Sequence, residues 1–284
     1  MPTLVLPADQ PFSLDSTLAC GQAFRWDRAE NGWWYGVVSG NAVRIRQEGL
    51  RLSYEGVSRE FVRDYFSLDS DLTAIFELID RDPFIHSAIT RCRGLRIVRQ
   101  PPWECLISYT IATNSNIPTI RRRIAAVAER FGRAIRFEGR TFYSFPEPGD
   151  ISCGNEGELS CCRLGYRQPF VFRNACGIPD REAWEKTLSA LPYEETREEL
   201  MKCTGIGPKA ADCISLFAFQ KYESFPVDVW IRRIMGDHYP VPTDPGKSLS
   251  KKEYDTIRRF GREYFGEYCG YAQEYLFADR GTDQ

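Results

Sequence analysis

The sequence predicts an α+β protein in which an N-terminal antiparallel β-sheet domain with flanking helices, residues 1–100, precedes an all-helical domain, residues 101–284. Two patterns lead to this prediction. Between Phe24 and Tyr54, apolar and polar residues alternate in short runs separated by turn-forming residues, as in antiparallel strands. Beyond residue 101, apolar residues recur at helical spacing almost to the end of the chain. The pair Pro101–Pro102 marks the boundary between these patterns.

The composition is that of a globular protein with a substantial core. At 284 residues, 43% of them hydrophobic, the chain is long enough for one large domain or two. Its net charge of −2 gives no general argument for binding a polyanion, so any nucleic-acid surface must be a local patch. One such patch is present, because the segment 121–136 contains one acidic residue, Glu129, and six arginines: Arg121, Arg122, Arg123, Arg130, Arg133 and Arg136.

The remaining compositional features exclude several classes of protein. The ten cysteines are scattered without a CxxC pair, which is typical of free thiols in a reducing cytosol. The two histidines, His86 and His238, are far apart, so we expect neither a metal site nor another cofactor. The N-terminal region has neither a basic signal-peptide segment nor a long apolar run. We therefore expect a monomeric protein without membrane contact.

The first half is predicted to form a meander of strands. In the runs 43–46 (VRIR) and 50–54 (LRLSY), apolar residues alternate with polar ones, which is typical of strands with one buried face. The run 95–98 (LRIV) is predicted to form one more strand that returns to this sheet. Between these strands, Asp69 is predicted to cap a helix that carries Leu72, Ile75 and Ile79.

Helices are predicted for most of the second half. The first covers the segment 103–111 with one apolar face, and the second carries an apolar stripe between Ile120 and Ile135 that leaves the arginines outward. For these arginines, a solvated face and a DNA-facing surface are equally plausible. The segment 136–159 is predicted to be a turn-rich connector. Helices then begin near Pro169, Asp180, Glu194, Ser250 (in a capping box with Glu253) and Cys269.

The most informative stretch lies between Glu198 and Met235. The sequence TGIG at 204–207 interrupts two helical patterns, and Pro208 follows where the first turn of a helix tolerates a residue without an N–H group. This pattern predicts a helix-hairpin-helix with its hairpin at 203–209. Gly205 and Gly207 let the backbone turn sharply, and the free N–H groups at the start of the second helix form a site for a DNA phosphate. Because phosphate contacts do not read bases, the hairpin alone predicts DNA binding without sequence specificity.

Lys209 and Asp228 are the candidate catalytic residues. Lys209 lies in the first turn of the second helix, and Asp228 opens the next helical pattern as an N-cap, so that an amine and a carboxylate face one groove. Each feature alone has an ordinary interpretation: the hairpin as an inert DNA clamp, the lysine as a solvated side chain, and the aspartate as a helix cap. The joint pattern is much more specific than its parts.

Together these residues resemble the helix-hairpin-helix-Gly/Pro-Asp superfamily of DNA glycosylases. Along nearly the whole chain, the sequence is similar to the eukaryote-type family of 8-oxoguanine DNA glycosylase/AP lyases, as a prokaryotic or archaeal member. Five stretches carry this resemblance in the family's order and approximate spacing: CGQAFRW at 20–26, ECL at 104–106 with NSNI at 114–117, LGYR at 164–167, KAADCI at 209–214, and GYAQ at 270–273 with LF at 276–277.

The resemblance implies a base pocket. The Gly21 carbonyl would accept a hydrogen bond from the N7–H group that 8-oxoguanine has and guanine lacks, a difference of about 1–3 kcal/mol. Cys213 and Phe277 would sandwich the flipped base, and Gln273 would bond its Watson–Crick edge. Taken singly, Gly21 also fits a simple turn, and Cys213 and Phe277 also fit core packing. The two candidate catalytic residues in the same chain favour the pocket roles.

The resemblance also implies residues that hold the DNA. Asn114 would fill the space left by the flipped nucleotide, Tyr166 would wedge into the base stack, and Arg167 would bond the orphaned cytosine. An ordinary, partly buried aromatic residue is the alternative interpretation of Tyr166. The hairpin glycines would bind the phosphate backbone.

The sequence departs from the family at two positions. The family's second arginine contact to the orphaned cytosine is matched by Thr119, which leaves the preference for cytosine open, and Arg122, one helical turn further on, is a candidate substitute. Trp230 stands where the family has a histidine near the 5′ phosphate. The four-cysteine iron–sulfur loop of some superfamily members is absent, because the C-terminal region has only Cys269.

The predicted function is excision of 8-oxoguanine from double-stranded DNA. Lys209 would attack the sugar C1′ and form a Schiff base, Asp228 would stabilise the cationic sugar, and β-elimination would cleave the strand 3′ to the lesion. Because an ordinary lysine is almost entirely protonated at pH 7, we expect desolvation to lower the pKa of Lys209. Such an enzyme would be cytoplasmic and nucleoid-associated in a prokaryote, or nuclear in a eukaryote. Two alternatives stay open: a glycosylase of the same fold for another damaged base, and a noncatalytic helix-hairpin-helix DNA-binding protein.

Overall fold

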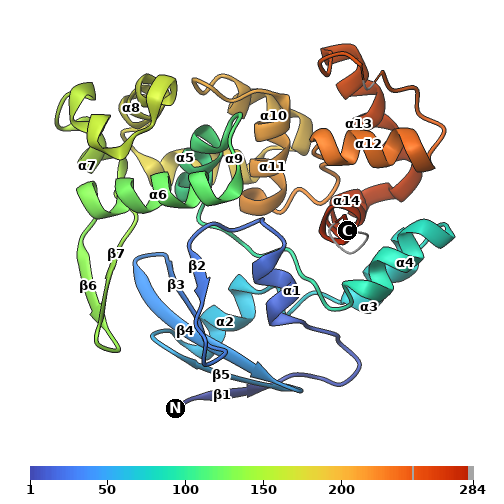
Figure 1. Cartoon of the computed structure of the whole chain (residues 1–284), viewed down its shortest axis with the longest axis horizontal. Coiled ribbons are helices and arrows are strands. Elements are labelled where there is room, and N and C mark those ends of the chain that lie inside the picture. Colours follow the sequence, from blue (N-terminus) through green and yellow to red (C-terminus); the bar gives the residue numbers. More distant parts are fainter. Residues whose placement is uncertain (245, 281–284) are drawn as a thin grey trace.

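The computed structural model describes residues 1–244 and 246–280, and it shows a sheet followed by helices. The sheet, in the lower half of Figure 1, has five antiparallel strands in the order β1-β5-β4-β3-β2. The predicted meander is confirmed, and β1 is an additional strand that pairs with β5 at one edge. The strands are β1 (Thr3–Val5), β2 (Trp26–Arg28), β3 (Trp34–Val38), β4 (Asn41–Glu48) and β5 (Arg51–Glu55); a separate hairpin contains β6 (Ala134–Phe137) and β7 (Arg140–Tyr143).

Helices make up most of the rest of the described chain. None of the described helices combines the length and the apolar character needed to cross a membrane. The α-helices are α1 (Leu14–Ala19), α2 (Arg59–Tyr65), α3 (Leu72–Ile79), α4 (Pro83–Arg91), α5 (Pro102–Ala112), α6 (Ile117–Phe131), α7 (Pro148–Ser152), α8 (Gln168–Gly177), α9 (Arg181–Ala190), α10 (Tyr193–Met201), α11 (Pro208–Phe219), α12 (Val229–His238), α13 (Lys251–Phe265) and α14 (Cys269–Asp279), and the 3₁₀ helices are η1 (Glu156–Cys162), η2 (Gly165–Arg167) and η3 (Gly266–Tyr268).

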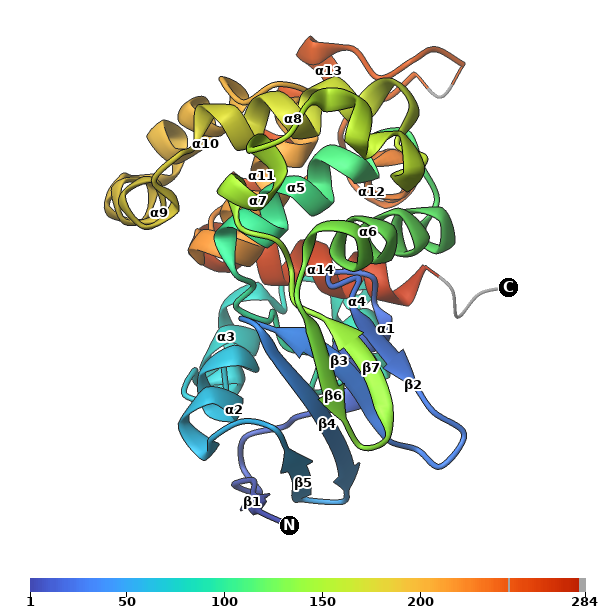
Figure 2. The same cartoon turned by 90° about the vertical axis from the view of Figure 1, so that its left-hand side faces the viewer.

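Both faces of the sheet are covered. Trp34, Ile45 and Tyr54 are neighbours in the strand register, and all three are buried in one core cluster with side chains of α1 and α2. On the other face, Tyr35 stacks on Phe142 of the β6–β7 hairpin, with ring centroids 6.3 Å apart. Figure 2 shows this hairpin reaching from the helical part of the molecule along the sheet. Coverage from two sides explains why every residue of β3 is buried.

The β6–β7 hairpin corrects the predicted connector at 136–159. Glu138 and Gly139 have φ angles of +50° and +70°, the positive pair that a two-residue hairpin turn requires, and the flanking residues Phe137 and Arg140 pair across it. The predicted helical stripe therefore ends with α6, and Ile135 belongs to β6 instead. The turn lacks the Asn-Gly or Asp-Gly sequence that usually announces such a hairpin.

The predicted strand at 95–98 is also wrong. This described segment is extended, but its backbone bonds to side chains rather than to a neighbouring strand. The amide of Arg96 donates to Thr17 Oγ1 at 3.1 Å, and the amide of Val98 donates to Gln22 Oε1 at 2.8 Å. These buried side chains satisfy the backbone groups that a strand would satisfy by pairing, so the segment joins two cores without entering the sheet.

Two helix predictions need smaller corrections. Asp71, not Asp69, caps α3, because its carboxylate accepts from the amide of Ala74 at 3.0 Å, whereas Asp69 forms an ion pair with Arg99. Helix α5 has no single apolar face: it is buried on all sides because it packs against α6, α8, α9 and α11. The predicted helix start near Asp180 and the predicted Ser250 cap are confirmed.

Helix α14, near the end of the chain, packs against helices from both the first third and the last third of the sequence. It packs against α3 and α4 on one side and α12 and α13 on the other. Tyr275 of α14 makes an edge-to-face contact with Phe76 of α3 at 5.5 Å and donates a hydrogen bond to the Leu95 carbonyl at 2.7 Å. The domain division at residue 100 stays a prediction, and α14 shows that side chains from both sides of it share one core cluster.

Candidate active site

The hairpin between α10 and α11 has a conformation that requires glycine. Gly205 has a φ of +81°, and a Cβ atom there would lie 2.5 Å from the Phe170 ring. Asn174 fixes the same turn, because its Oδ1 accepts from the amide of Thr204 at 2.8 Å and its Nδ2 donates to the Thr204 carbonyl at 3.1 Å. Gly207 is the N-cap of α11, and a Cβ atom there would meet no described atom within 4 Å, so a ligand can approach the first-turn N–H groups.

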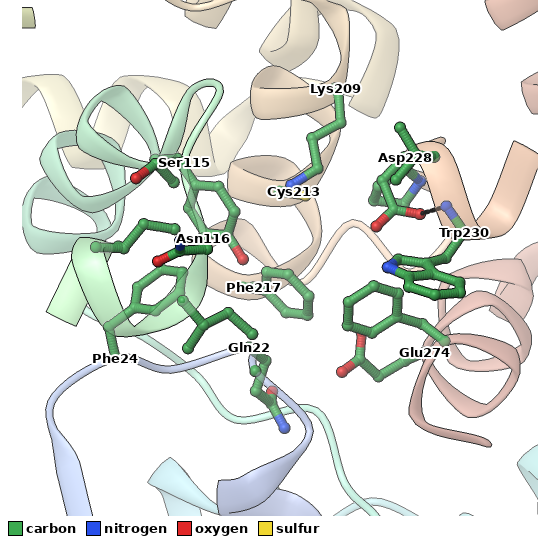
Figure 3. Close-up of a pocket in the computed structure, with 18 of the residues that line it drawn as sticks. Gln22, Phe24, Ser115, Asn116, Lys209, Cys213, Phe217, Asp228, Trp230 and Glu274 are labelled. Carbon is green, nitrogen blue, oxygen red and sulfur yellow. Dashed lines mark hydrogen bonds between the residues drawn. The ribbon is translucent and has the colours of Figure 1, made fainter. Parts of the chain in front are cut away.

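A cavity of about 440 Å³ opens beside this hairpin, between α5, α6, α11, α12, α14 and the segment 20–24. Its lining contains every predicted pocket and catalytic residue, and Figure 3 shows several of them around the same space. Segments that are far apart in the sequence therefore converge on one site. The six residues are Gly21, Lys209, Cys213, Asp228, Gln273 and Phe277.

Lys209 extends from the start of α11 into the cavity. Protein atoms of the cavity wall surround its side chain, but solvent reaches it through the open cavity. Its Nζ lies 5.1 Å from the centroid of the Tyr109 ring, a cation–π distance. Burial lowers the pKa of Lys209, but Cys213 and Asp228 raise it, and the net direction is upward. The pKa of Lys209 is raised because the open cavity limits desolvation of the ammonium group. The expected lowering is therefore wrong for the protein without DNA.

Cys213 lies one helical turn after Lys209 and shares a hydrogen bond with it. Burial raises the pKa of the Cys213 thiol to about 11, and the neighbouring ammonium only partly offsets this. Cys213 is therefore neutral at pH 7. After Cys213, the Asp228 carboxylate is the largest contributor that raises the pKa of Lys209.

Asp228 combines a capping position with a place in the cavity. Its Oδ1 accepts from the amides of Trp230 at 3.0 Å and Ile231 at 2.8 Å, which makes it the N-cap of α12. Only one carboxylate oxygen is used for the cap, so the other is available to the cavity. The cap fixes the carboxylate in place, and the structural and catalytic interpretations are thus compatible.

Gly21 and Gln273 both line the pocket. Gly21 has a φ of +104°, and a Cβ atom there would lie 3.0 Å from Ile117 and 3.9 Å from the Phe277 ring, so a side chain would be strained and would crowd the pocket. Gln273 is 5% exposed, and its Oε1 has no hydrogen-bond partner among the described residues. A buried polar atom without a partner is typical of a ligand site.

The comparisons with known proteins agree with this geometry. Residues 4–106 match the model of the 8-oxoguanine DNA glycosylase N-terminal domain. A probable N-glycosylase/DNA lyase of Methanothermobacter thermautotrophicus is 32% identical over 77% of this chain and 73% of its own length. The 8-oxoguanine glycosylase/lyase of Clostridium acetobutylicum, solved with DNA containing cytosine opposite 8-oxoguanine, has a TM-score of 0.88 and 34% identity, covering 96% of this chain and 93% of that one. The chain belongs to the 8-oxoguanine DNA glycosylase/lyase family.

A more distant solved structure shows how widely the fold is shared. The 3-methyladenine DNA glycosylase of Archaeoglobus fulgidus has a TM-score of 0.78 but only 20% identity, covering 99% of this chain and 98% of that one. At this identity the likeness concerns the fold alone. The choice of damaged base within the 8-oxoguanine glycosylase/lyase family must therefore be argued from the residues of the cavity.

The predicted DNA-holding residues form a cluster of their own beside the cavity. Asn114 Nδ2 donates to Tyr166 Oη at 3.4 Å, and the Arg167 guanidinium lies 4.3 Å from the centre of the Tyr166 ring. Tyr166 is 52% exposed and Asn114 is also at the surface, whereas Arg167 is buried and donates to the Thr113 carbonyl at 2.9 Å. The structure brings the three residues together, and their contacts with DNA stay a prediction.

The arginines near the start of α6 differ in role: some hold neighbouring segments of the protein, and one is free to face DNA. Arg121 donates to the carbonyl groups of Phe24 and Trp26, and Arg123 donates to the Arg163 carbonyl, so both hold neighbouring segments in place. Arg122 is exposed and donates only to Thr119 Oγ1, at 3.2 Å, among the partners that the structure describes. Arg122 therefore remains the candidate for a contact with DNA in this family member.

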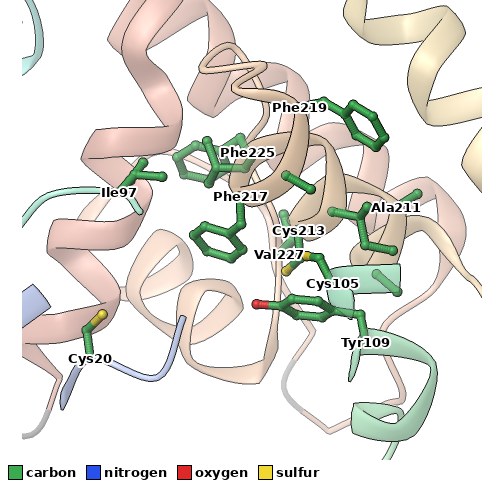
Figure 4. Packing of buried hydrophobic residues seen from close by; sticks show 14 of the residues in the cluster. Cys20, Ile97, Cys105, Tyr109, Ala211, Cys213, Phe217, Phe219, Phe225 and Val227 are labelled. Carbon is green, nitrogen blue, oxygen red and sulfur yellow. The ribbon is translucent and has the colours of Figure 1, made fainter. Parts of the chain in front are cut away.

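Sequence reasoning missed part of the cavity lining. Tyr109 and Phe217 stack with centroids 6.0 Å apart, and Phe24 meets Tyr109 edge-on at 5.7 Å. Figure 4 shows Tyr109 and Phe217 within the packed core. Both lie on helices that are buried all round, so periodicity gave them no special face. Glu274 and Arg280 were missed as well, although a charged residue in the apolar run of α14 is a usable sequence signal.

Proposed function

We propose that this chain excises 8-oxoguanine from duplex DNA through a Schiff base on Lys209 and then cleaves the strand 3′ to the abasic site. The observation that carries the proposal is the shared cavity of Lys209, Asp228 and Gly21. An amine, a fixed carboxylate and the backbone carbonyl of Gly21 in one apolar, aromatic pocket suit a flipped base and its sugar. Membership of the 8-oxoguanine glycosylase/lyase family supports the choice of base.

Catalysis begins with phosphate contacts at the start of α11 and extrusion of the damaged nucleotide. The Lys209 ammonium must lose one proton before its nitrogen can bond to C1′. The bond between C1′ and the base then breaks, the base leaves with its electron pair and takes up a proton, and the Asp228 carboxylate stabilises the positive charge on the sugar. Opening of the sugar ring gives the Schiff base, and loss of a C2′ proton breaks the C3′–O bond.

The other proposed roles follow the arrangement of the cluster beside the cavity. Asn114 and Tyr166 occupy the gap and the base stack, and Arg167 contacts the orphaned cytosine. Arg122 is proposed as a second contact in place of the family arginine that Thr119 replaces. We further propose that the protein acts as a monomer, where chromosomal DNA lies: in the prokaryotic cytoplasm with the nucleoid, or in the eukaryotic nucleus.

Borohydride trapping tests this function. The purified protein is incubated with duplexes that carry one 8-oxoguanine opposite cytosine, adenine, guanine or thymine, and reduction links any Schiff base to the DNA. We expect an adduct with the native chain and none with Lys209→Gln, which should still bind the duplex. The exposed residue Lys251 provides a matched control, because Lys251→Gln should give the native yield.

Each trapping outcome has a distinct meaning. Adducts with all four partners would tie relaxed pairing to Thr119, whereas an adduct only opposite cytosine would mean that Arg167 suffices. Base release without an adduct would indicate a monofunctional glycosylase. If neither base release nor an adduct is observed, the proposal is refuted in favour of a noncatalytic DNA-binding protein. Cleavage of a duplex with an alkylated purine would instead indicate a glycosylase for another damaged base.

A further inference from the structure

One acidic residue in the cavity has no role in the chemistry above. Glu274 lies on α14, is 2% exposed and lines the cavity with the aromatic side chains. Its Oε1 has no hydrogen-bond partner among the residues that the structure describes. Burying a carboxylate without full hydrogen bonding is unfavourable, so such a residue is seldom found where packing alone is needed.

Contacts place Glu274 at the Gly21 end of the pocket. Its carboxyl group interacts electrostatically with Cys20, the residue directly before Gly21. Phe277 follows Glu274 by one helical turn on the same side of α14, and Phe277 is also the ring nearest to Gly21. The carboxylate therefore lies beside the backbone that is proposed to meet N7 of the damaged base.

We propose that Glu274 is a specificity-determining residue, whose carboxylate favours a base that presents an N–H group to the Gly21 end of the pocket and disfavours one that presents a lone pair. This inference rests on the proposed function. 8-Oxoguanine has a hydrogen on N7, whereas guanine has a lone pair there. A negative charge at this place attracts the first and repels the second, which adds a repulsive element to the attraction of the Gly21 carbonyl.

The charge of Glu274 depends on pH near neutrality. Burial raises the pKa of its carboxyl group to about 7, while Cys20 and Arg280 partly lower it. Below about pH 7 the carboxyl is protonated, becomes a donor and no longer repels a lone pair. The titratable and charged groups that face Glu274 are Cys20, Cys92 at the end of α4, Tyr109 of α5, Lys209 of α11, Asp228 before α12 and Arg280 after α14.

Two thiols and a phenol among these neighbours do not change charge in the same range. Burial raises the pKa of Cys92 to about 11 and the pKa values of Cys20 and Tyr109 well above their usual range, so all three stay neutral. The pKa of Lys209 is raised, so its amine stays protonated without DNA. A rise of excision centred near pH 7 that is absent from cleavage of a preformed abasic site, which also uses Lys209, is therefore the signature of Glu274.

The test compares excision of 8-oxoguanine with cleavage of a preformed abasic site, because only the first reaction needs base recognition. Both rates are measured in single turnovers from about pH 5.5 to about pH 8.5 for the native chain, Glu274→Gln and the exposed control Glu267→Gln. We expect native excision to rise with pH and level off above about pH 7. In Glu274→Gln, excision should lose this rise and fall at least about tenfold at pH 8, with abasic-site cleavage unchanged within about twofold.

Three results would overturn the inference. Glu274→Gln could retain the native excision rate and pH profile, or it could lose excision and abasic-site cleavage equally, which would indicate a structural role. Absence of abasic-site cleavage in the native chain would instead refute the proposed lyase function, and the inference with it. Because glutamine has nearly the same shape as glutamate, we expect the variant to fold.

Discussion

The raised pKa of the Glu274 carboxyl group predicts a pH dependence of the free energy of unfolding, which can be measured without any assay of activity. The difference between its pKa of about 7 and the usual 4.5, at about 1.4 kcal/mol for each pH unit, corresponds to about 3 kcal/mol. Because the folded-state pKa is the higher one, this contribution to stability is complete below about pH 4.5 and is lost as the pH rises through 7. Above pH 7, Glu274 no longer supplies it, since the carboxylate must ionise in a buried site.

Urea unfolding of the native chain, Glu274→Gln and Glu267→Gln measures this contribution between about pH 5 and about pH 8.5. Glutamine does not titrate, and the other titrating groups nearly cancel in the difference between the two chains. We expect the free energy of unfolding of Glu274→Gln, relative to the native chain, to increase by up to about 3 kcal/mol from the acid to the alkaline end. Glu267→Gln should show a constant difference. A pH-independent difference for Glu274→Gln would refute the raised pKa.

Three further variants test the fixed geometry of the site. Asp228→Asn should keep the α12 cap, because asparagine caps as well as aspartate, so denaturant unfolding should change by less than about 1 kcal/mol while excision slows by orders of magnitude; a variant that simply unfolds would leave Asp228 as a cap alone. Gly205→Ala should lower the free energy of unfolding by at least about 1–2 kcal/mol, because residue 205 has a positive φ and its Cβ atom would meet the Phe170 ring. Gly207→Ala is the control: its Cβ atom would meet open space, so the free energy of unfolding should change by less than about 1 kcal/mol. Equal losses of stability in the two glycine variants would contradict this explanation of the hairpin.

The sequence predicted those parts of the site that consist of local motifs. Gly21, Lys209 and Phe277 were each found from a short stretch whose residues sit together in the chain, and the structure brings the three stretches to one cavity. Local signals failed where long-range partners decide the conformation. The segment 95–98 alternates like a strand, but buried side chains from Thr17 and Gln22 take the hydrogen bonds that a strand partner would need.

The charge state of Lys209 shows the same limit and has a consequence for catalysis. From the sequence, the amine was treated as a group to be desolvated. Asp228 was expected to face the same groove, but the effect of its carboxylate on the pKa of Lys209 was not considered. In the open cavity Cys213 and Asp228 together outweigh burial, so the proposed nucleophile stays protonated in the protein without DNA. A flipped nucleotide changes both the burial of Lys209 and the charge around it. It displaces water from the cavity and brings the developing positive charge of the sugar towards Asp228. In the proposed mechanism, Lys209 therefore becomes reactive only after a flipped base has entered the pocket.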